Sequence, residues 1–322
     1  MRIVLIGAVC STEATLERLV AHGMQVTAVF GYRPLDATNV SGYVDLEPLA
    51  RKAGVPFHPF RSINDPSTVA AVRSLAPDVL FVVGLSQLVG RELLATAPRG
   101  AVGYHPTALP EGRGRAPVAW LVLEKRSGAS TFFELTAGAD EGGIFVQQPF
   151  AVDEIDDASS VEAKVLESLR VALDRWLPRL KSGEWRPVEQ RHELATCYGK
   201  RAPEDGLLRW TEPADALDRL IKASTRPHPG AFTYRSGEKM LVWQSKLEGD
   251  GKLRGVPGRV LLVDDAKGAL LQTGTGLLWL VEYETIARDQ GRLRVGEKLG
   301  FDAEIEIHSI LARLRRLEEQ SR

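Results

Sequence analysis

The length, composition and charge of this chain are those expected of an ordinary globular protein with two domains. It has 322 residues, of which 44% are hydrophobic and 26% charged, and this length exceeds the usual span of one hydrophobic core. Its 41 basic and 42 acidic residues leave a formal net charge of -1. That balance excludes a global positive field that would draw the protein onto nucleic acid or an anionic membrane.

The cysteines and the apolar runs exclude further classes. Cys10 and Cys197 form no CxxC pair and sit among no ligand-spaced histidines, so neither a disulfide framework nor a metal site is predicted. The apolar run within residues 1–10 is too short for a signal peptide, and no stretch approaches the ~20 apolar residues of a membrane span. We therefore expect a cytoplasmic protein without membrane association.

The first quarter of the chain predicts the class of the first domain, because aliphatic runs typical of strands alternate with runs of helical spacing. The expected strands are Arg2–Ile6, Gln25–Phe30, Pro56–Phe60 and Asp78–Val83, and the expected helices are Thr12–Ala21, Leu46–Ala53 and Pro66–Leu75. Such alternation is typical of an α/β fold with a doubly wound, mainly parallel sheet. Ligands bind such sheets beyond the carboxyl ends of the strands, where the loop Gly84–Val89 is expected.

The rest of the chain predicts a second, mainly β domain. A long amphipathic helix over Ser160–Leu180 precedes a polar, strand-poor stretch, Gly183–Glu204, with the character of a linker. A helix at 213–224 follows, and then short strands separated by Gly and Asp turns, which favour a small barrel. The tail Glu304–Glu319 is expected to form a charged helix that packs on one of the domains. The predicted boundaries are a first domain at 1–190, a linker at 191–205, a barrel domain at 206–303 and a C-terminal helix at 304–322.

Two turn-rich segments carry residues suited to acyl transfer. The first, GYHPTALPEGRGRAPVAW at 103–120, places His105 beside a proline, and we expect it on a rigid loop. Its imidazole can take a proton from an attacking amine near neutral pH. The second, GADEGGI at 138–144, places Asp140 after an apolar strand, and a carboxylate close to His105 would orient the ring. On these residues alone, a hydrogen-bonded His and a turn-forming Asp remain an alternative.

The same segments resemble the folate-dependent formyltransferase family, which includes methionyl-tRNA formyltransferase and sugar-nucleotide N-formyltransferases. The family pattern has an Asn two residues before a His, then LeuPro and ArgGly turns, and an Asp in a GlyAlaAsp-x-Gly loop. The matching residues here are His105, Leu109, Pro110, Arg113, Gly114 and Asp140. The resemblance continues through 196–210 and 226–233. It implies a Rossmann-like formyltransferase domain, an OB-like β-barrel domain, and His105 and Asp140 as catalytic residues.

One position departs from the family pattern, because Gly103 stands where the family has its catalytic Asn. Loss of one oxyanion donor typically costs about 2.7 to 4 kcal/mol of transition-state stabilisation. A backbone N–H or an ordered water near Gly103 could replace the amide; a side chain such as Gln87, Tyr104 or Thr107 could do so; or the freed space could serve another acyl group or chemistry. A homologue that binds folate without catalysis is a further alternative. We hypothesise that catalysis persists, because His105 and Asp140 remain together.

The resemblance also implies a formyl donor, 10-formyltetrahydrofolate, and residues that hold it. The pterin is expected against Gln87, Leu88 and Val89 and against Thr136, Ala137, Gly138, Ala139 and Asp140. Arg115 matches a position near the donor, and its guanidinium suits an anionic group of the donor or acceptor. Arg113 is as well suited to bracing the loop as to binding a ligand. The segment IGAVCS at 6–11 is not a GxGxxG fingerprint, so no NAD site is predicted.

The acceptor implied by the resemblance is a small-molecule primary amine. Residues 63–81 and 195–210 look most like the formyltransferase domain that modifies a UDP-linked 4-amino-arabinose, which favours an amino-sugar nucleotide. A tRNA acceptor gains little support from the neutral net charge. Methionyl-tRNA formyltransferase stays an alternative, because several basic residues could form a strip that binds tRNA. The other interpretation of these residues is an ordinary solvated charged face. They are Lys200, Arg201, Arg209, Arg219, Lys222 and Arg226. A homodimer is left open.

Overall fold

The chain divides into two compact units, Met1–Arg201 and Ala202–Arg322. The computed structural model describes residues 1–37, 40–249, 252–285, 291–301 and 303–320. The division falls inside the stretch 191–205 that the sequence analysis treats as a linker. Much of the polar stretch before it packs onto the first unit, since Val188 pairs with Ile144 and Gln190 is buried.

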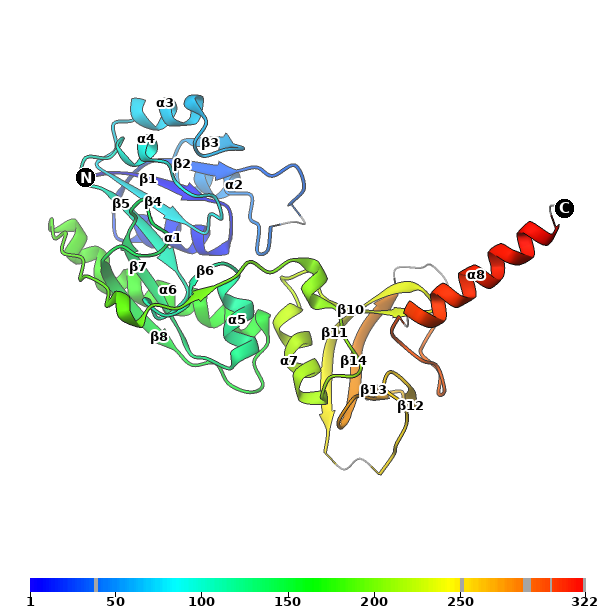
Figure 1. Ribbon diagram of the computed structural model, residues 1–322. Coiled ribbons are helices and arrows are strands. Elements are labelled where there is room, and N and C mark those ends of the chain that lie inside the picture. The colour runs from blue at the N-terminus through cyan, green and yellow to red at the C-terminus, as the bar shows by residue number, and fades with distance from the viewer. Residues whose placement is uncertain (38–39, 250–251, 286–290, 302, 321–322) are drawn as a thin grey trace. The chain divides into compact units, whose positions relative to one another are not determined.

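A seven-stranded sheet forms the centre of the first unit (Figure 1). Its order is β3-β2-β1-β4-β5-β7-β8. Strands β1 to β5 are parallel to one another, and β7 is antiparallel to both of its neighbours, β5 and β8. This confirms the predicted α/β fold with a mainly parallel sheet. The strands are β1 (Arg2–Gly7), β2 (Gln25–Tyr32), β3 (Phe57–Phe60), β4 (Val79–Val83), β5 (Ala101–His105), β7 (Gly128–Glu134) and β8 (Ile144–Phe150).

Helices cover both faces of this sheet, because each presents an apolar stripe to it. On one face, α1 and α6 pack with Phe81 and Phe132, and on the other, α3 and α4 pack with Ile6 and Leu80. Asp157 caps α6, since its carboxylate accepts a hydrogen bond from the Ser160 N–H at 2.8 Å. The helices are α1 (Cys10–Ala21), α2 (Glu47–Lys52), α3 (Pro66–Ser74), α4 (Arg91–Leu94), α5 (Pro117–Glu124) and α6 (Ala158–Lys181).

The strand order creates a switch point between β1 and β4. The chain runs outward from β1 to β3 and then returns to place β4 on the other side of β1, and ligands bind such sheets at this crevice. Thr12 ties the two strands together, because its hydroxyl donates to the Val83 carbonyl at 2.7 Å and accepts from the Ala8 N–H at 3.0 Å. The carboxyl ends of β1, β4 and β5 therefore lie at one fixed edge.

The prediction that His105 lies on a loop is wrong. His105 is the last residue of β5, opposite Thr131 of β7, and Tyr104 pairs with Phe132. The antiparallel ladder with β7 extends the strand beyond the apolar pair that ends the sequence pattern. His105 is therefore held by sheet hydrogen bonding, which positions a functional side chain more firmly than a loop does.

The second unit is built on a five-stranded antiparallel sheet of order β10-β11-β14-β13-β12. Isolated bridges join Leu299 to Arg235 and Lys298 to Arg259, so one segment contacts both outer strands. The predicted mainly β character of the second unit is confirmed, and its OB-like barrel topology stays a prediction. The elements are η3 (Pro203–Gly206), α7 (Ala214–Ser224), β10 (Ala231–Arg235), β11 (Glu238–Glu248), β12 (Val260–Asp264), β13 (Gly268–Gln272) and β14 (Leu277–Thr285).

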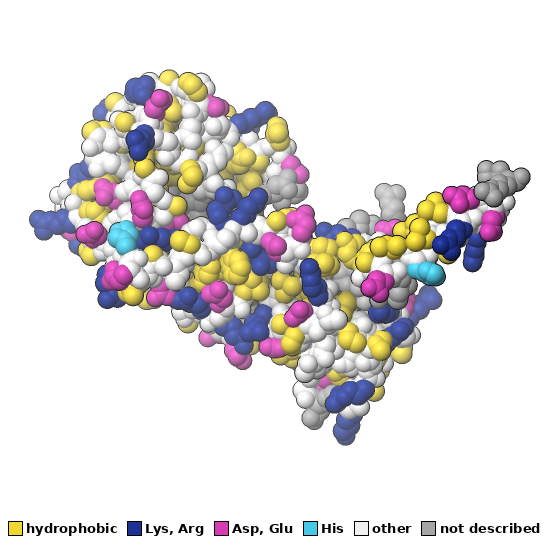
Figure 2. Space-filling view, in the orientation of Figure 1, with side chains coloured by type: hydrophobic (Ala, Val, Ile, Leu, Met, Phe, Trp, Pro, Cys, Tyr) yellow, Lys and Arg dark blue, Asp and Glu magenta, His cyan; other side chains and the backbone are white. Residues whose placement is uncertain are grey.

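The last helix, α8 (Ala303–Gln320), carries exposed apolar side chains (Figure 2). Ile307, Ile310, Leu311, Leu314 and Leu317 are 48 to 61% exposed. These side chains are therefore not packed against the second unit, contrary to the expectation that the helix packs on a domain. None of the helices within the described ranges is long and apolar enough to span a membrane.

Candidate active site

A pocket of about 610 Å³ lies at the carboxyl edge of the first unit's sheet. Its walls come from the segments that follow β1, β4, β5 and β7, and from the first turns of α6. Every residue that the sequence analysis assigned to the site lines this pocket. They are Gln87, Leu88, Val89, Gly103, His105, Arg115, Thr136, Ala137, Gly138, Ala139 and Asp140. Residues distant in the sequence are thus brought together, and their individual roles remain predictions.

His105 and Asp140 form a pair with a defined proton arrangement. The His105 ring is buried, and its Nε2 lies 2.9 Å from the Gly112 carbonyl oxygen. A carbonyl oxygen only accepts hydrogen bonds, so Nε2 carries a proton and Nδ1 is the basic nitrogen of the neutral ring. Nδ1 lies 3.8 Å from Asp140 Oδ2. A proton taken up at Nδ1 therefore creates an imidazolium that faces a carboxylate.

Asp140 is held by hydrogen bonds from two directions. Its Oδ2 accepts from the Gly114 N–H at 2.9 Å, and its backbone carbonyl accepts from Gln190 Nε2 at 2.9 Å. Gln190 Nε2 also reaches the Gly142 carbonyl, while its Oε1 accepts from Arg113 Nη2 at 2.7 Å. Asp140 adopts a left-handed backbone with φ of 56°, which Asp tolerates better than most residues. Arg113 thus braces the loop and does not face the pocket.

A short parallel pair of strands fixes the turn that supplies the Gly114 N–H. Here β6 (Arg113–Gly114) pairs with β9 (Cys197–Tyr198), just after η2 (His192–Leu194). Tyr198 stacks on Trp120 of α5 with ring centroids 5.5 Å apart, and its hydroxyl donates to Glu124 at 2.8 Å. Burial and the Glu124 carboxylate raise the pKa of Tyr198 to about 12. The polar stretch after α6 is therefore part of the site's scaffold.

The position of the missing Asn offers no freed space. A Cβ atom at Gly103 would lie 2.7 Å from Phe133 Cζ and 3.0 Å from Leu135 Cδ1. Phe133 is buried against the strands and also lines the pocket, so its ring can shift only toward that space. Phe133 and Leu135 thus occupy the space directly beside Gly103, and the hypothesis that this site serves a different acyl group stays a prediction.

The side chains proposed to replace the Asn amide are all engaged elsewhere. The Tyr104 hydroxyl bonds to Ser130 Oγ at 3.0 Å, on the opposite face of β5 from Gly103. The Gln87 amide accepts from the Ile63 N–H and donates to the Arg61 carbonyl, and the buried Thr107 hydroxyl donates to Gly112 O at 3.3 Å. A backbone N–H, an ordered water and the second Nε2–H of Gln87 are the compensations that remain of those considered.

Introducing the family's Asn should therefore harm this protein. We expect Gly103→Asn to lower the free energy of unfolding by about 1 to 3 kcal/mol through overpacking against Phe133, without raising the turnover rate. Gly103→Ala, which adds only the Cβ, should reproduce most of the loss, and Phe133→Leu in the Gly103→Asn background should recover part of it. Thermal denaturation and a formyl-transfer assay measure both quantities. An unchanged melting temperature with faster turnover would show that the space is open.

Glu162, in the second turn of α6, lines the same pocket and was missed by the sequence analysis. Burial raises the pKa of its carboxyl group above the ordinary value. A signal was available, because Glu162 interrupts the apolar stripe of α6 between Val161 and Val165, both buried. A charged residue at a stripe position is rare unless it is paired or functional.

The raised pKa of Glu162 implies that this carboxyl group destabilises the folded protein at neutral pH. A carboxyl group whose pKa is higher in the folded state binds more protons there, so it lowers stability as pH rises above the unfolded pKa. Glu162→Gln should therefore raise the melting temperature at about pH 7 and leave it nearly unchanged at about pH 3, where the group is largely protonated in both states. The expected rise is about 2 to 4 °C for each kcal/mol. Glu167→Gln, at an exposed position of α6, is the matched control, and equal destabilisation at both pH values would contradict the prediction.

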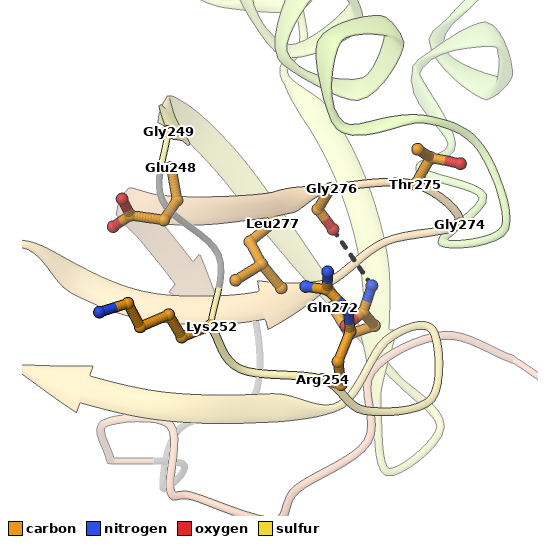
Figure 3. Close-up of a pocket in the computed structure, with 9 residues that line it drawn as sticks. All are labelled: Glu248, Gly249, Lys252, Arg254, Gln272, Gly274, Thr275, Gly276 and Leu277. Carbon is orange, nitrogen blue, oxygen red and sulfur yellow. Dashed lines mark hydrogen bonds between the residues drawn. The ribbon is translucent and has the colours of Figure 1, made fainter.

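A second pocket, of about 580 Å³, lies in the second unit (Figure 3). Its Gln272 side chain accepts from the Gly255 N–H and donates to the Gly276 carbonyl, and Glu248 accepts from Trp279 Nε1 at 2.9 Å. Among its described lining residues there is no His or Cys. These polar groups support local turns.

The fold and the His–Asp pair define a group-transfer enzyme of the α/β class. The chain belongs to the formyl transferase family: residues 4–176 match the family described as formyl transferase, and residues 200–291 match its C-terminal domain. The predicted family and enzyme class are thereby confirmed.

Solved structures of low identity share this fold. HypX from Aquifex aeolicus, in complex with tetrahydrofolic acid, is 18% identical with a TM-score of 0.64, over 91% of this chain and 46% of HypX. This chain therefore spans about half the length of HypX. An N-formyltransferase from Helicobacter canadensis, in complex with folinic acid and dTDP-3-aminofucose, is 14% identical with a TM-score of 0.66, over 87% and 98% of the two chains. Methionyl-tRNA formyltransferase from Clostridium thermocellum is 15% identical with a TM-score of 0.54, over 77% and 94%.

Proposed function

We propose that this protein transfers a formyl group from 10-formyltetrahydrofolate to the primary amine of an amino-sugar nucleotide. The observation that carries the proposal is the His105–Asp140 pair, whose basic Nδ1 faces a carboxylate within a pocket of about 610 Å³. That volume falls in the range of small-molecule sites. The family to which the chain belongs supplies the reaction class.

The loop 136–140 has groups that suit a folate. Within the described part of the chain, the backbone N–H groups of residues 136–139 have no protein acceptor, and the buried Thr136 hydroxyl has no partner. Polar groups left unpaired in a pocket are expected to find partners in a ligand. The Arg115 guanidinium also lacks a partner among the described residues and suits an anion. HypX and the Helicobacter enzyme bind folates in their solved structures, which adds support.

His105 moves the proton in the proposed reaction. As the amine nitrogen attacks the formyl carbon, Nδ1 accepts a proton from that nitrogen and later returns it to the leaving nitrogen of the folate. Asp140 stabilises the intervening imidazolium, and the Gly112 carbonyl keeps the ring oriented through Nε2. A backbone N–H or a water takes the place of the missing amide beside the developing oxyanion.

Three of the six basic residues considered for a tRNA are paired with carboxylates. Arg219 pairs with Asp215 at 3.1 Å and Lys222 with Asp218 at 2.8 Å. Arg226 likewise pairs with a carboxylate. Neutralised cations contribute little to the phosphate contacts on which nucleic-acid affinity rests.

A panel assay tests the acceptor. The protein is mixed with 10-formyltetrahydrofolate and amino-sugar nucleotides, free amines or methionyl-tRNA, and tetrahydrofolate release and product mass are followed. We expect a formylated amino-sugar nucleotide and weak salt dependence. Product from methionyl-tRNA alone, with a steep loss at higher salt, would instead indicate the tRNA enzyme. No turnover with any amine would contradict the proposed function.

A further inference from the structure

Glu162 is a carboxylate in the active-site pocket without a protein partner. Across the described residues it makes no hydrogen bond or ion pair, although it lines the pocket that holds His105. A partly buried carboxylate without a partner destabilises the folded protein. Such a group at a pocket wall is therefore a candidate for ligand recognition.

Three cations of α1 and α6 are paired with other carboxylates. The pairs are Lys164 with Asp153 and Asp156, Arg170 with Glu17, and Arg18 with Asp174. The Lys164 pairs are short, at 2.7 and 2.6 Å, and Asp156 is buried. These lysine and arginine side chains are thus committed elsewhere, and a cationic group of a ligand is a partner that Glu162 can take.

The two walls of the pocket differ in character. On one side, the segment after β7 presents the unpaired N–H groups of residues 136–139, and the segment after β4 lines the same pocket. On the other side, Glu162 comes from α6, and Ser11 and Val9 come from the start of α1. Tyr104 lies on the Glu162 side, because its ring packs against Phe132 and its hydroxyl bonds to Ser130. If the donor occupies the first wall, the second is left for the acceptor.

We propose that Glu162 binds the ammonium group of the acceptor and removes its first proton. This inference rests on the proposed function, because it assigns an acceptor subsite within the same pocket. The subsite is specific for amines over alcohols, since a carboxylate beside a protonated amine forms a charge-assisted hydrogen bond that a hydroxyl group does not match.

This assignment accounts for both protons that the ammonium nitrogen loses in the reaction. The ammonium transfers one proton to the Glu162 carboxylate and becomes a neutral amine, whose lone pair forms the new C–N bond with the formyl carbon. His105 accepts the second proton from that nitrogen and delivers it to the folate nitrogen as the old C–N bond breaks. The products are the formamide, tetrahydrofolate and one proton, which Glu162 releases to solvent.

Burial supports this role, because the raised pKa of Glu162 makes it a stronger proton acceptor than an ordinary carboxylate. The other titratable groups beside it are Tyr104 on β5 and Cys10 on α1, whose pKa values are also raised by burial. Because a raised pKa keeps a thiol or a phenol protonated, both groups are neutral at physiological pH. Neither therefore competes with Glu162 for the ammonium group.

Binding measurements on paired ligands test the inference. The probes are UDP-4-amino-4-deoxy-L-arabinose and UDP-L-arabinose, which carry an amine and a hydroxyl at the same position. Calorimetry with the wild type, Glu162→Gln and Glu167→Gln gives the preference of each protein for the amine. We expect the wild type and Glu167→Gln to share a preference that Glu162→Gln loses by about 10- to 100-fold. Glutamine preserves the shape of Glu162, and the melting temperature reports folding.

The outcomes separate this inference from the proposed function. Equal binding of both probes by the wild type, or an amine preference that survives Glu162→Gln, overturns the assignment of Glu162. Turnover by the wild type with Glu162→Gln as active as Glu167→Gln also overturns it, and leaves formyl transfer standing. If the wild type turns over no amine, the proposed function fails, and the binding preference alone decides whether Glu162 recognises an ammonium.

Discussion

Replacement of His105 by glutamine is expected to lower kcat for formyl transfer by about 10²- to 10⁴-fold, the usual contribution of a positioned proton-transfer group. A glutamine amide can still donate to the Gly112 carbonyl, so the packing around the ring position is retained. It offers no basic nitrogen toward Asp140, so the proton of the attacking amine has no acceptor. The rate of tetrahydrofolate release at saturating donor and acceptor measures the loss.

The control separates catalysis from folding and binding. His58→Gln removes an imidazole from β3, where the ring stacks on Phe30 at 4.8 Å and lies outside the pocket lining, and it should leave kcat unchanged. Folate affinity of His105→Gln should also match the wild type. A His105→Gln enzyme within about threefold of the wild-type kcat would show that another group relays the proton.

Asp140→Asn should produce the second large loss, of about 10²- to 10⁴-fold in kcat. Asparagine accepts the left-handed backbone and its carbonyl oxygen can still accept from the Gly114 N–H. The change therefore removes the charge and preserves the geometry. Without the carboxylate, the imidazolium at His105 loses the counter-charge that lies 3.8 Å away.

Glu141→Gln is the matched control for this substitution, because it removes a neighbouring charge from the same loop outside the pocket lining. It should keep wild-type kcat. Steady-state rates and melting temperatures of both variants measure the effect. Equal rates for Asp140→Asn and Glu141→Gln would contradict a role for the Asp140 charge.

The features of the fold with strong local patterns could be predicted from the sequence. The first four parallel strands and the helices between them follow from aliphatic runs and helical spacing. The end of β5 could not, because Gly103 to His105 extend the strand through pairing with β7, a partner some 25 to 30 residues away in the chain. The pattern at 103–105 alone is that of a turn.

The segments with recognisable motifs line one pocket, whereas the residues that only tertiary structure brings to it carry no local signal. His105 and Asp140 lie in recognisable segments, and both line one pocket. Gln190, which braces the Asp140 loop, lies in a polar stretch without periodicity, so nothing local marks it. The packing of Phe133 against Gly103 is likewise a long-range contact, so no local pattern in the sequence indicates it.

The fate of a labelled formyl group tests the central claim most directly. The protein is incubated with tetrahydrofolate carrying a ¹³C-formyl group at N10 and with an amino-sugar nucleotide, and the carbon spectrum is followed for the wild type and His105→Gln. Our account predicts that the label moves to a new formamide of the acceptor, with an equal amount of tetrahydrofolate, in the wild type alone. Label that stays on the folate or appears only as formate, with folate bound to the protein, would contradict formyl transfer.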